Sequence, residues 1–233
     1  MGDAGEAHGS VGAMKLYSGP LSMFGAKAEI AALEKALELE LVMVPFEMAT
    51  LYQPKHPEVL RINPKRQVPV LVDGDLELFD STQIFEYFET LKPEPALWPA
   101  EPKARARARL LEHKSDEVYF PPIVRLMGLQ NAPDDPAAVE ARAASAAFYN
   151  EMERTLGAAH WLAGSYSYAD IAFYMAQLFG ARMGAPMDGT HPRLLAWRNR
   201  MSARPAVAQV AGAMGRYLLS QDRKLPPFLQ ALT

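Results

Sequence analysis

Cysteine is absent from the 233-residue chain. This absence excludes disulfide bonds, thiolate metal sites and cysteine nucleophiles. Any thiol chemistry that the protein performs must therefore use a thiol supplied by a substrate. The sequence also lacks a phosphate-binding loop, a dinucleotide-binding fingerprint and the nucleophile elbow of serine hydrolases.

Long apolar runs are missing as well. No segment reaches the ~18 consecutive apolar residues that indicate a membrane-spanning helix. Residues 1–13 have neither the cationic start nor the apolar stretch of a signal peptide, and we interpret them as a flexible leader. We therefore expect a cytoplasmic protein with no membrane partner.

Neither sign of charge predominates, because 24 Lys and Arg residues face 27 Asp and Glu residues, for a formal net charge of -3. Such a balance gives no bulk attraction to nucleic acid, so we expect no nucleic-acid partner. We also expect no metal site. His113, Asp116 and Glu117 have helical spacing, but nothing supplies a convincing third or fourth ligand.

Residues 14–92 alternate between strand and helix patterns. Strands are predicted at 15–17 and 41–44, and the helix between them has its apolar stripe at Ala26, Ile30, Leu33 and Leu37. A short helix follows at 57–62. Strands at 68–72 and 76–79 flank Asp73-Gly74-Asp75, a strong hairpin signal, and another helix begins near Ser81. This order predicts an α/β thioredoxin-like N-terminal domain.

Strand patterns disappear beyond residue 92. Residues 93–101 contain a proline-rich break that we interpret as a linker, and 102–233 as an all-α helical C-terminal domain. Helices are predicted over 102–129, 136–156, 168–183, 192–203 and 206–219. Ser167 and Asp170 have the spacing of a capping box, and we assign Asp170 to folding.

Five short segments then resemble the glutathione transferase superfamily, in the family's order and over nearly the whole chain after the leader. They are Leu16-Tyr17 leading to Ser22, the stretch 63–71 containing Val68-Pro69, Asp80-Ser81, 167–172, and 192–207. The start of the chain is most similar to the serine-type zeta and tau classes. Because Leu21-Ser22-Met23-Phe24 lacks the zeta triplet, we expect a bacterial-type member of uncertain class.

The resemblance implies that Ser22 is catalytic and holds the sulfur of glutathione as a thiolate. Ser22 stands between the first strand and the first helix, and the neighbouring Gly25 is expected to let backbone N–H groups approach the sulfur. Taken alone, Ser22 is better explained as a turn or cap residue, and the other four segments favour the catalytic role. Tyr17 offers a competing hydroxyl, but it lies within the strand pattern and is expected to be packed.

The resemblance also implies glutathione-binding roles, for Phe24, Lys55, Val68, Pro69, Asp80 and Ser81. Pro69 matches the family's cis-proline, which turns the Val68 backbone toward glutathione. Asp80 and Ser81 are expected at the γ-glutamyl end, although helix capping alone would explain both residues. Lys55 matches a position that binds the glycyl carboxylate, but an ordinary exposed lysine is the alternative.

The acceptor substrate is expected between the domains, near Met23, Tyr119, Phe120 and Ile123. The predicted function is a glutathione transferase that uses glutathione as co-substrate, without a metal, to attack a small hydrophobic electrophile. Glutathione-dependent isomerisation, dehalogenation and ether cleavage are close variants. The alternative is a non-catalytic glutathione-binding or regulatory protein with the same fold. The family resemblance further implies a homodimer.

Overall fold

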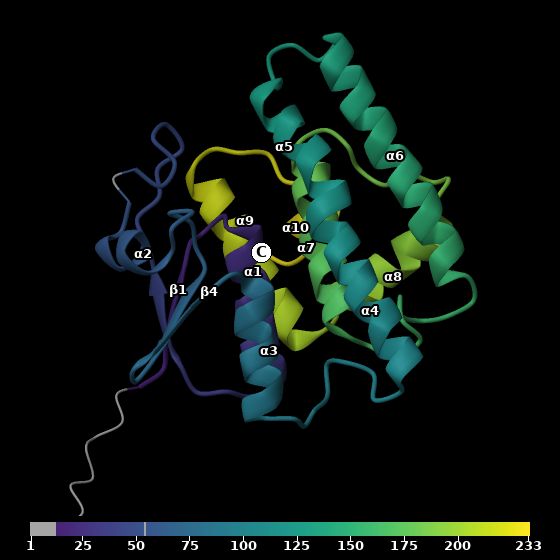
Figure 1. Ribbon diagram of the computed structural model, residues 1–233. Coiled ribbons are helices and arrows are strands. Elements are labelled where there is room, and N and C mark those ends of the chain that lie inside the picture. The colour runs from purple at the N-terminus through teal and green to yellow at the C-terminus, as the bar shows by residue number, and fades with distance from the viewer. Residues whose placement is uncertain (1–12, 54) are drawn as a thin grey trace, which may run out of the picture.

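A computed structural model of the chain describes residues 13–53 and 55–233, so most of the predicted leader lies outside the described residues. The N-terminal part is a four-stranded mixed sheet with helices on both faces, and the rest of the described chain is helical (Figure 1). The predicted fold class is confirmed. Within the described residues, no helix is both long and apolar enough to span a lipid bilayer.

The strands are β1 (Lys15–Ser18), β2 (Glu40–Met43), β3 (Val70–Asp73) and β4 (Leu76–Phe79), in the spatial order β2-β1-β3-β4. β1 pairs with β2 in parallel and with β3 in antiparallel fashion, and β3 and β4 form the predicted hairpin. Gly74 occupies its turn with a φ of +60°, a conformation that glycine adopts without steric cost.

Alternation along the strands divides the core of the sheet into two sides. Leu16 and Leu71 belong to the main hydrophobic core, into which α1 (Met23–Glu34) and α3 (Ser81–Leu91) also pack. Tyr17 and Val70 point the other way, into a smaller cluster that includes Val59 of α2 (Pro57–Ile62). Tyr17 is therefore packed, as predicted.

Helix α1 differs from its predicted amphipathic pattern. It ends at Glu34, so Leu37 lies beyond it, and the supposed core residue Leu33 is 39% exposed. Most other positions of α1 are buried, including Lys27 and Glu29. The reason is that α1 is enclosed by β1, α3, α7 (Tyr168–Arg182) and α9 (Pro205–Ser220), so no single face meets water.

The helical part comprises α4 (Pro102–Lys114), the π-helical turn η1 (Ser115–Tyr119), α5 (Phe120–Gly128), α6 (Pro136–Leu156), α7, α8 (Pro192–Ser202), α9 and α10 (Pro227–Gln230). The single helix predicted over 102–129 is thus interrupted at η1. Pro121 and Pro122 follow one residue after η1. Because proline lacks an N–H and clashes with the carbonyl four residues earlier, a regular α-helix cannot continue through them unchanged.

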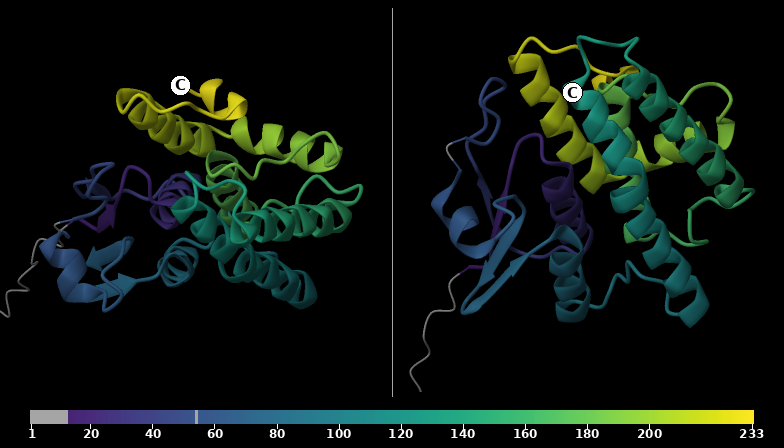
Figure 2. Two further views of the ribbon diagram at one scale, coloured as in Figure 1. Left: turned by 90° about the horizontal axis from the view of Figure 1, so that it is seen from above. Right: turned by 45° about the horizontal axis from the view of Figure 1, so that its top comes forward.

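Helix α7 forms the centre of the helical part and contacts α1, α4, α5 and α8. The Asp170 carboxylate holds its first turn, accepting hydrogen bonds from the backbone N–H groups of Leu162 and Ser167, both at 3.0 Å, and from the indole N–H of Trp197 at 2.9 Å. The predicted folding role of Asp170 is confirmed. Figure 2 shows α1 and α3 between the sheet and the remaining helices.

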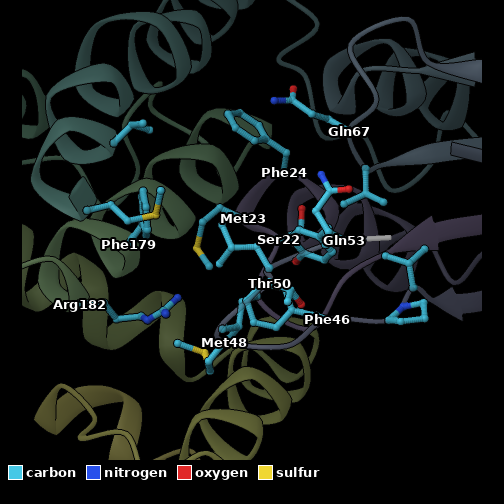
Figure 3. Close-up of a pocket in the computed structure, with 18 of the residues that line it drawn as sticks. Ser22, Met23, Phe24, Phe46, Met48, Thr50, Gln53, Gln67, Phe179 and Arg182 are labelled. Carbon is cyan, nitrogen blue, oxygen red and sulfur yellow. The ribbon is translucent and has the colours of Figure 1, made fainter. Parts of the chain in front are cut away.

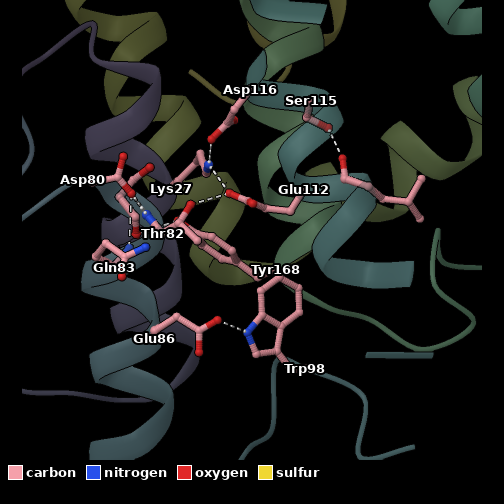
Figure 4. Close-up of polar contacts among 12 residues, drawn as sticks. Lys27, Asp80, Thr82, Gln83, Glu86, Trp98, Glu112, Ser115, Asp116 and Tyr168 are labelled. Carbon is pink, nitrogen blue, oxygen red and sulfur yellow. Dashed lines mark hydrogen bonds and ion pairs between the residues drawn. The ribbon is translucent and has the colours of Figure 1, made fainter. Parts of the chain in front are cut away.

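A buried ion-pair network joins α1 to the helical part (Figure 4). Lys27 of α1 is 1% exposed, and its Nζ lies 2.8 Å from Glu112 Oε1 of α4 and 2.5 Å from Asp116 Oδ2 of η1. Thr82 of α3 donates its hydroxyl to the same Glu112 oxygen at 2.5 Å. Asp116, considered above as a metal ligand, therefore pairs with a lysine, and the described residues contain no cluster suited to a metal ion.

Candidate active site

A cavity of about 810 Å³ lies where the N-terminal part meets the helices. Its walls come from the first turn of α1, residues within 44–53 and 55–56, the loop before β3, and residues of α5, α7 and α9. Figure 3 shows Ser22, Met23 and Phe24 in the middle of this region, with Gln53 and Gln67 on one side and Phe179 and Arg182 on the other. The structure thus brings the predicted catalytic serine to a space between the two parts of the chain.

Ser22 is the N-cap of α1 and is 9% exposed. Its Oγ accepts the backbone N–H of Gly25 at 2.9 Å, which anchors the side chain at the mouth of the helix. Because the oxygen acts only as an acceptor in this contact, its hydrogen is free to be donated to a ligand atom in the cavity. The cap role and a thiolate-binding role are therefore compatible in one hydroxyl.

Gly25 has a packing role that the sequence did not predict, and its predicted role toward the glutathione sulfur stays a prediction. A Cβ at this position would lie 2.1 Å from Ser18 Oγ, so the glycine lets the first turn of α1 approach the end of β1. The Ser18 hydroxyl in turn donates a hydrogen bond to the Glu29 carboxylate, and burial raises the pKa of Glu29. This packing fixes the position of Ser22 relative to the strand.

The loop before β3 supplies a second part of the wall. Asn63, which is buried, accepts the N–H of Lys65 with its Oδ1 and donates its amide to the Gln67 carbonyl at 2.6 Å. The loop so held carries Gln67 and Val68 to the cavity, and the Val68–Pro69 peptide bond is cis. Pro69 itself does not line the cavity.

Asp80 and Ser81 lie at the start of α3 and do not line the cavity. The Asp80 carboxylate accepts the N–H groups of Thr82 at 3.0 Å and Gln83 at 3.3 Å, so it caps the helix. Ser81 is 2% exposed, and its carbonyl accepts the Tyr168 hydroxyl at 3.0 Å. The capping interpretation describes the observed contacts, and a glutathione contact of either residue stays a prediction.

The acceptor-pocket residues divide into two sets. Met23 and Phe120 line the cavity, whereas Tyr119 and Ile123 do not and are 0% exposed. The Tyr119 hydroxyl contacts the Tyr149 hydroxyl inside the helical core. Helix periodicity explains the difference, because the positions that share the cavity face with Phe120 are Val124 and Met127.

Phe24 and Phe120 belong to one aromatic wall. The Phe24 ring centroid lies 4.7 Å from that of Phe120, which in turn lies 5.1 Å from that of Phe179. The three side chains come from α1, α5 and α7, so the wall joins the N-terminal part to the helical part. Phe179 was not anticipated from the sequence, because nothing in its local pattern distinguishes it from a core residue.

Lys55 lines the cavity together with several cations that the sequence analysis missed. Within the described residues, the lining includes five Lys or Arg side chains and no Asp or Glu, and the cations are Lys55, Arg66, Arg182, Arg223 and Lys224. The whole chain has a net charge of -3, so the cavity is locally opposite in sign to the molecule. This arrangement favours an anionic ligand.

Comparison with known families identifies both parts of the chain. Residues 16–96 match the model of the glutathione S-transferase N-terminal domain, and residues 116–205 match that of the C-terminal domain. Glutathione S-transferase 3 of Zea mays is 32% identical over 214 residues, which cover 86% of this chain and 94% of the maize protein. The chain belongs to the glutathione S-transferase family.

Two further known proteins are similar to this chain. A crystal structure of a glutathione S-transferase from Rhodospirillum rubrum superposes with a TM-score of 0.73 and 28% identity, covering 85% of this chain and 91% of that chain. A stringent starvation protein A homolog of Coxiella burnetii is 35% identical over 109 residues. That match covers 46% of this chain and 48% of the relative, so it spans about half of that protein.

Proposed function

We propose that this chain is a glutathione transferase in which the Ser22 hydroxyl donates a hydrogen bond to the glutathione sulfur and stabilises it as a thiolate. The observation that carries the proposal is the Ser22 hydroxyl at the N-terminus of α1. It lines the cavity and, among the described residues, its oxygen accepts only the backbone N–H of Gly25. The thiolate attacks a carbon of the electrophile, forming a C–S bond while the leaving group departs with its electron pair.

The energy required is within reach of this geometry. A free thiol has a pKa near 8.5, and lowering it by about two units requires roughly 2.7 kcal/mol of preferential thiolate stabilisation. A hydrogen bond to a charged acceptor contributes about 1.5–3 kcal/mol, and the positive end of a helix adds roughly 0.3–1 kcal/mol. The Ser22 hydroxyl and the start of α1 together reach that value without a general base.

Glutathione also carries two carboxylates and an ammonium group. On the side of the cavity formed by the N-terminal part, Lys55 and Arg66 supply positive charge and Val68 supplies backbone groups. We assign these residues to the glutathione backbone and carboxylates. The aromatic wall and Met23 then face the electrophile, whose chemical class decides between conjugation and the isomerase, dehalogenase or etherase variants.

The test is a titration of bound glutathione followed by the ultraviolet absorbance of its thiolate, in the wild type and in Ser22→Ala. We expect the variant to raise the pKa of the bound thiol by about one to two units and to lower kcat/KM about 10–100-fold, while glutathione still binds. Tyr17→Phe is the matched control, because this packed hydroxyl should leave both values unchanged. A Ser22→Ala enzyme with wild-type turnover would refute the role of Ser22.

A second function has its own support. The match to a stringent starvation protein A homolog, and the Asp80 carboxylate engaged in capping α3, favour a glutathione-binding regulatory protein without turnover. Calorimetry with glutathione, combined with a panel of aryl halides and epoxides, separates the two. Millimolar or tighter binding without any conjugation would establish this alternative.

We further propose that the protein is a homodimer, as the family resemblance implies. Sedimentation equilibrium over a tenfold concentration range measures the assembly directly. We expect twice the mass of the chain, and a monomer at every concentration would contradict the proposal.

A further inference from the structure

The cations of the cavity fall into two sets that come from different parts of the chain. Lys55 and Arg66 belong to the N-terminal part, whereas Arg182, Arg223 and Lys224 belong to the helical part and the segment after α9. The first set suffices for the carboxylates of glutathione in the function proposed above. The second set therefore needs another explanation.

Arg182 is the most informative member of the second set. It is the last residue of α7, it is half-buried, and its side chain extends toward Met23 and Met48 in Figure 3. Burial lowers the pKa of Arg182 to about 10, an effect that the nearby Tyr52 only partly offsets. The guanidinium nevertheless stays charged at neutral pH.

No carboxylate of the described residues lies within ion-pair distance of Arg182, and none lines the cavity. A cation withdrawn from water without a partner is unfavourable, and the C-terminal end of α7 compensates only in part. Such a group is retained at a cost in stability when a ligand supplies the missing anion.

The surroundings of Arg182 define the rest of that ligand. The neighbouring Phe179 and Met183, with Phe120 and Met127 of α5, make this wall apolar and partly aromatic. In Figure 3, Arg182 lies on one side of Ser22, and Gln67, which stands between Arg66 and Val68 in the sequence, lies on the other. A planar guanidinium binds a carboxylate through two parallel N–H···O bonds.

We propose that the acceptor substrate is an electrophile with an aromatic body and a carboxylate group, and that Arg182 binds this carboxylate while the body packs on Phe120 and Phe179. This inference rests on the transferase function proposed above. It adds a substrate class and a specificity residue to that function. The carboxylate takes no part in bond making and orients the ring so that its reactive carbon faces the sulfur.

The experiment uses 4-chloro-3,5-dinitrobenzoate and its methyl ester, which share the ring and the leaving group and differ in charge. In both, the thiolate of glutathione forms a C–S bond at the carbon that carries chlorine, and chloride leaves with the electron pair of the C–Cl bond. For each enzyme variant, the value of kcat/KM for the carboxylate is divided by that for the ester. Comparing this ratio between variants removes the difference in intrinsic reactivity of the two compounds.

We expect Arg182→Gln to lower the carboxylate-to-ester ratio about 10–100-fold, and Arg182→Lys to lower it less, because lysine keeps the charge but loses the paired geometry. Arg125→Gln is the control, since Arg125 is an exposed arginine of the neighbouring α5 that pairs with Glu140. It should leave the ratio at its wild-type value. In addition, 3,5-dinitrobenzoate, which has no leaving group, should inhibit turnover of the ester more weakly in Arg182→Gln than in the wild type.

Two results would overturn the inference and are distinguishable from each other. If Arg182→Gln changes both substrates by the same factor and inhibition by 3,5-dinitrobenzoate is unaltered, Arg182 does not recognise the carboxylate, and the transferase function stands. If the wild type conjugates neither compound, the transferase function fails, and this inference fails with it.

Discussion

Lys27 of α1 and Arg182 of α7 are both cations that are at least partly buried. Of these two, only Lys27 has carboxylate partners among the described residues. Lys27 is 1% exposed between Glu112 and Asp116, and its neighbours close around it. Arg182 reaches into a cavity that no described acidic residue lines. The difference separates a charge that holds the two parts of the molecule together from a charge that is left for a ligand.

The two regions also differ in what surrounds the charge. At Lys27, Thr82 and Tyr168 add polar or aromatic contacts to the ion pairs, so the site is satisfied without a ligand. At Arg182, the neighbouring side chains of α5 and α7 are apolar, and none of the described residues supplies a carboxylate partner. Substituting Lys27 should therefore lower the free energy of unfolding, whereas substituting Arg182 should leave it unchanged or raise it.

The largest effect is expected for Lys27→Met. Removing the ammonium leaves two buried carboxylates facing each other, and breaking a buried ion pair in this way costs about 3–5 kcal/mol. Urea denaturation followed by tryptophan fluorescence measures the loss. The control is Lys15→Met, which removes an exposed pair with Glu40 and should cost less than about 1 kcal/mol. Equal losses in the two variants would show that the network does not stabilise the fold.

The pH dependence of stability tests the buried network at Asp116. Burial raises the pKa of Asp116 to about 6. The Glu112 charge also raises this pKa, and the Lys27 charge lowers it. Because the folded state then binds this proton more tightly than the unfolded state, the contribution of Asp116 to stability is present at low pH. It is lost as the pH rises through about 6.

The quantity measured is the free energy of unfolding of the wild type minus that of Asp116→Asn. We expect this difference to fall by about 1–3 kcal/mol between roughly pH 4 and pH 7. Asp75→Asn, in the exposed turn between β3 and β4, is the control and should show no such trend. A difference that rises with pH would mean that pairing with Lys27 outweighs burial.

Arg182→Met is expected to change the free energy of unfolding less than Lys27→Met does, and not to lower it. The substitution removes a charge that burial destabilises and replaces it with an apolar side chain on an apolar wall. Without ligand, the free energy of unfolding should stay constant or rise by up to about 1–2 kcal/mol. A loss of unfolding free energy as large as that of Lys27→Met would show that Arg182 has a structural partner, and the proposed difference between the two cations would be wrong.

The smallest effect is expected at the protein surface. Arg125 and Glu140 lie 3.5 Å apart, and both are more than half exposed. Arg125→Gln should change the free energy of unfolding by less than about 0.5 kcal/mol, with no dependence on ligand. A larger change would indicate that the α5–α6 contact depends on this pair.

Much of the fold could be predicted from local patterns. The short helix at 57–62, the hairpin around Asp73-Gly74-Asp75 and the Ser167–Asp170 cap were all predicted and are observed, because each depends on residues close in sequence. The interruption at η1 was missed, although Pro121 and Pro122 were a visible signal for it. The stripe in α1 was correct at Ala26 and Ile30 and wrong at Leu33 and Leu37, because periodicity cannot show where a helix ends or that neighbours enclose most of its surface.

The site was predicted less completely. Ser22 was placed correctly at the start of the first helix, since a strand, a turn and a cap define that position locally. Tyr119 and Ile123 were assigned to the acceptor pocket, yet the cavity face of that segment is formed by Phe120, Val124 and Met127. The helical period defines which residues share a face, but it does not say which face meets the cavity.

By itself, the sequence determined that the chain has no thiol of its own, that an α/β part precedes a helical part, and that a serine stands between the first strand and the first helix. The tertiary structure alone decided the surroundings of the buried Lys27 and the half-buried Arg182. Lys27 meets Glu112 across 85 residues of chain, and Arg182 lines the same cavity as Ser22. Local sequence determines local conformation, whereas the pairing of distant charges depends on how the finished elements pack.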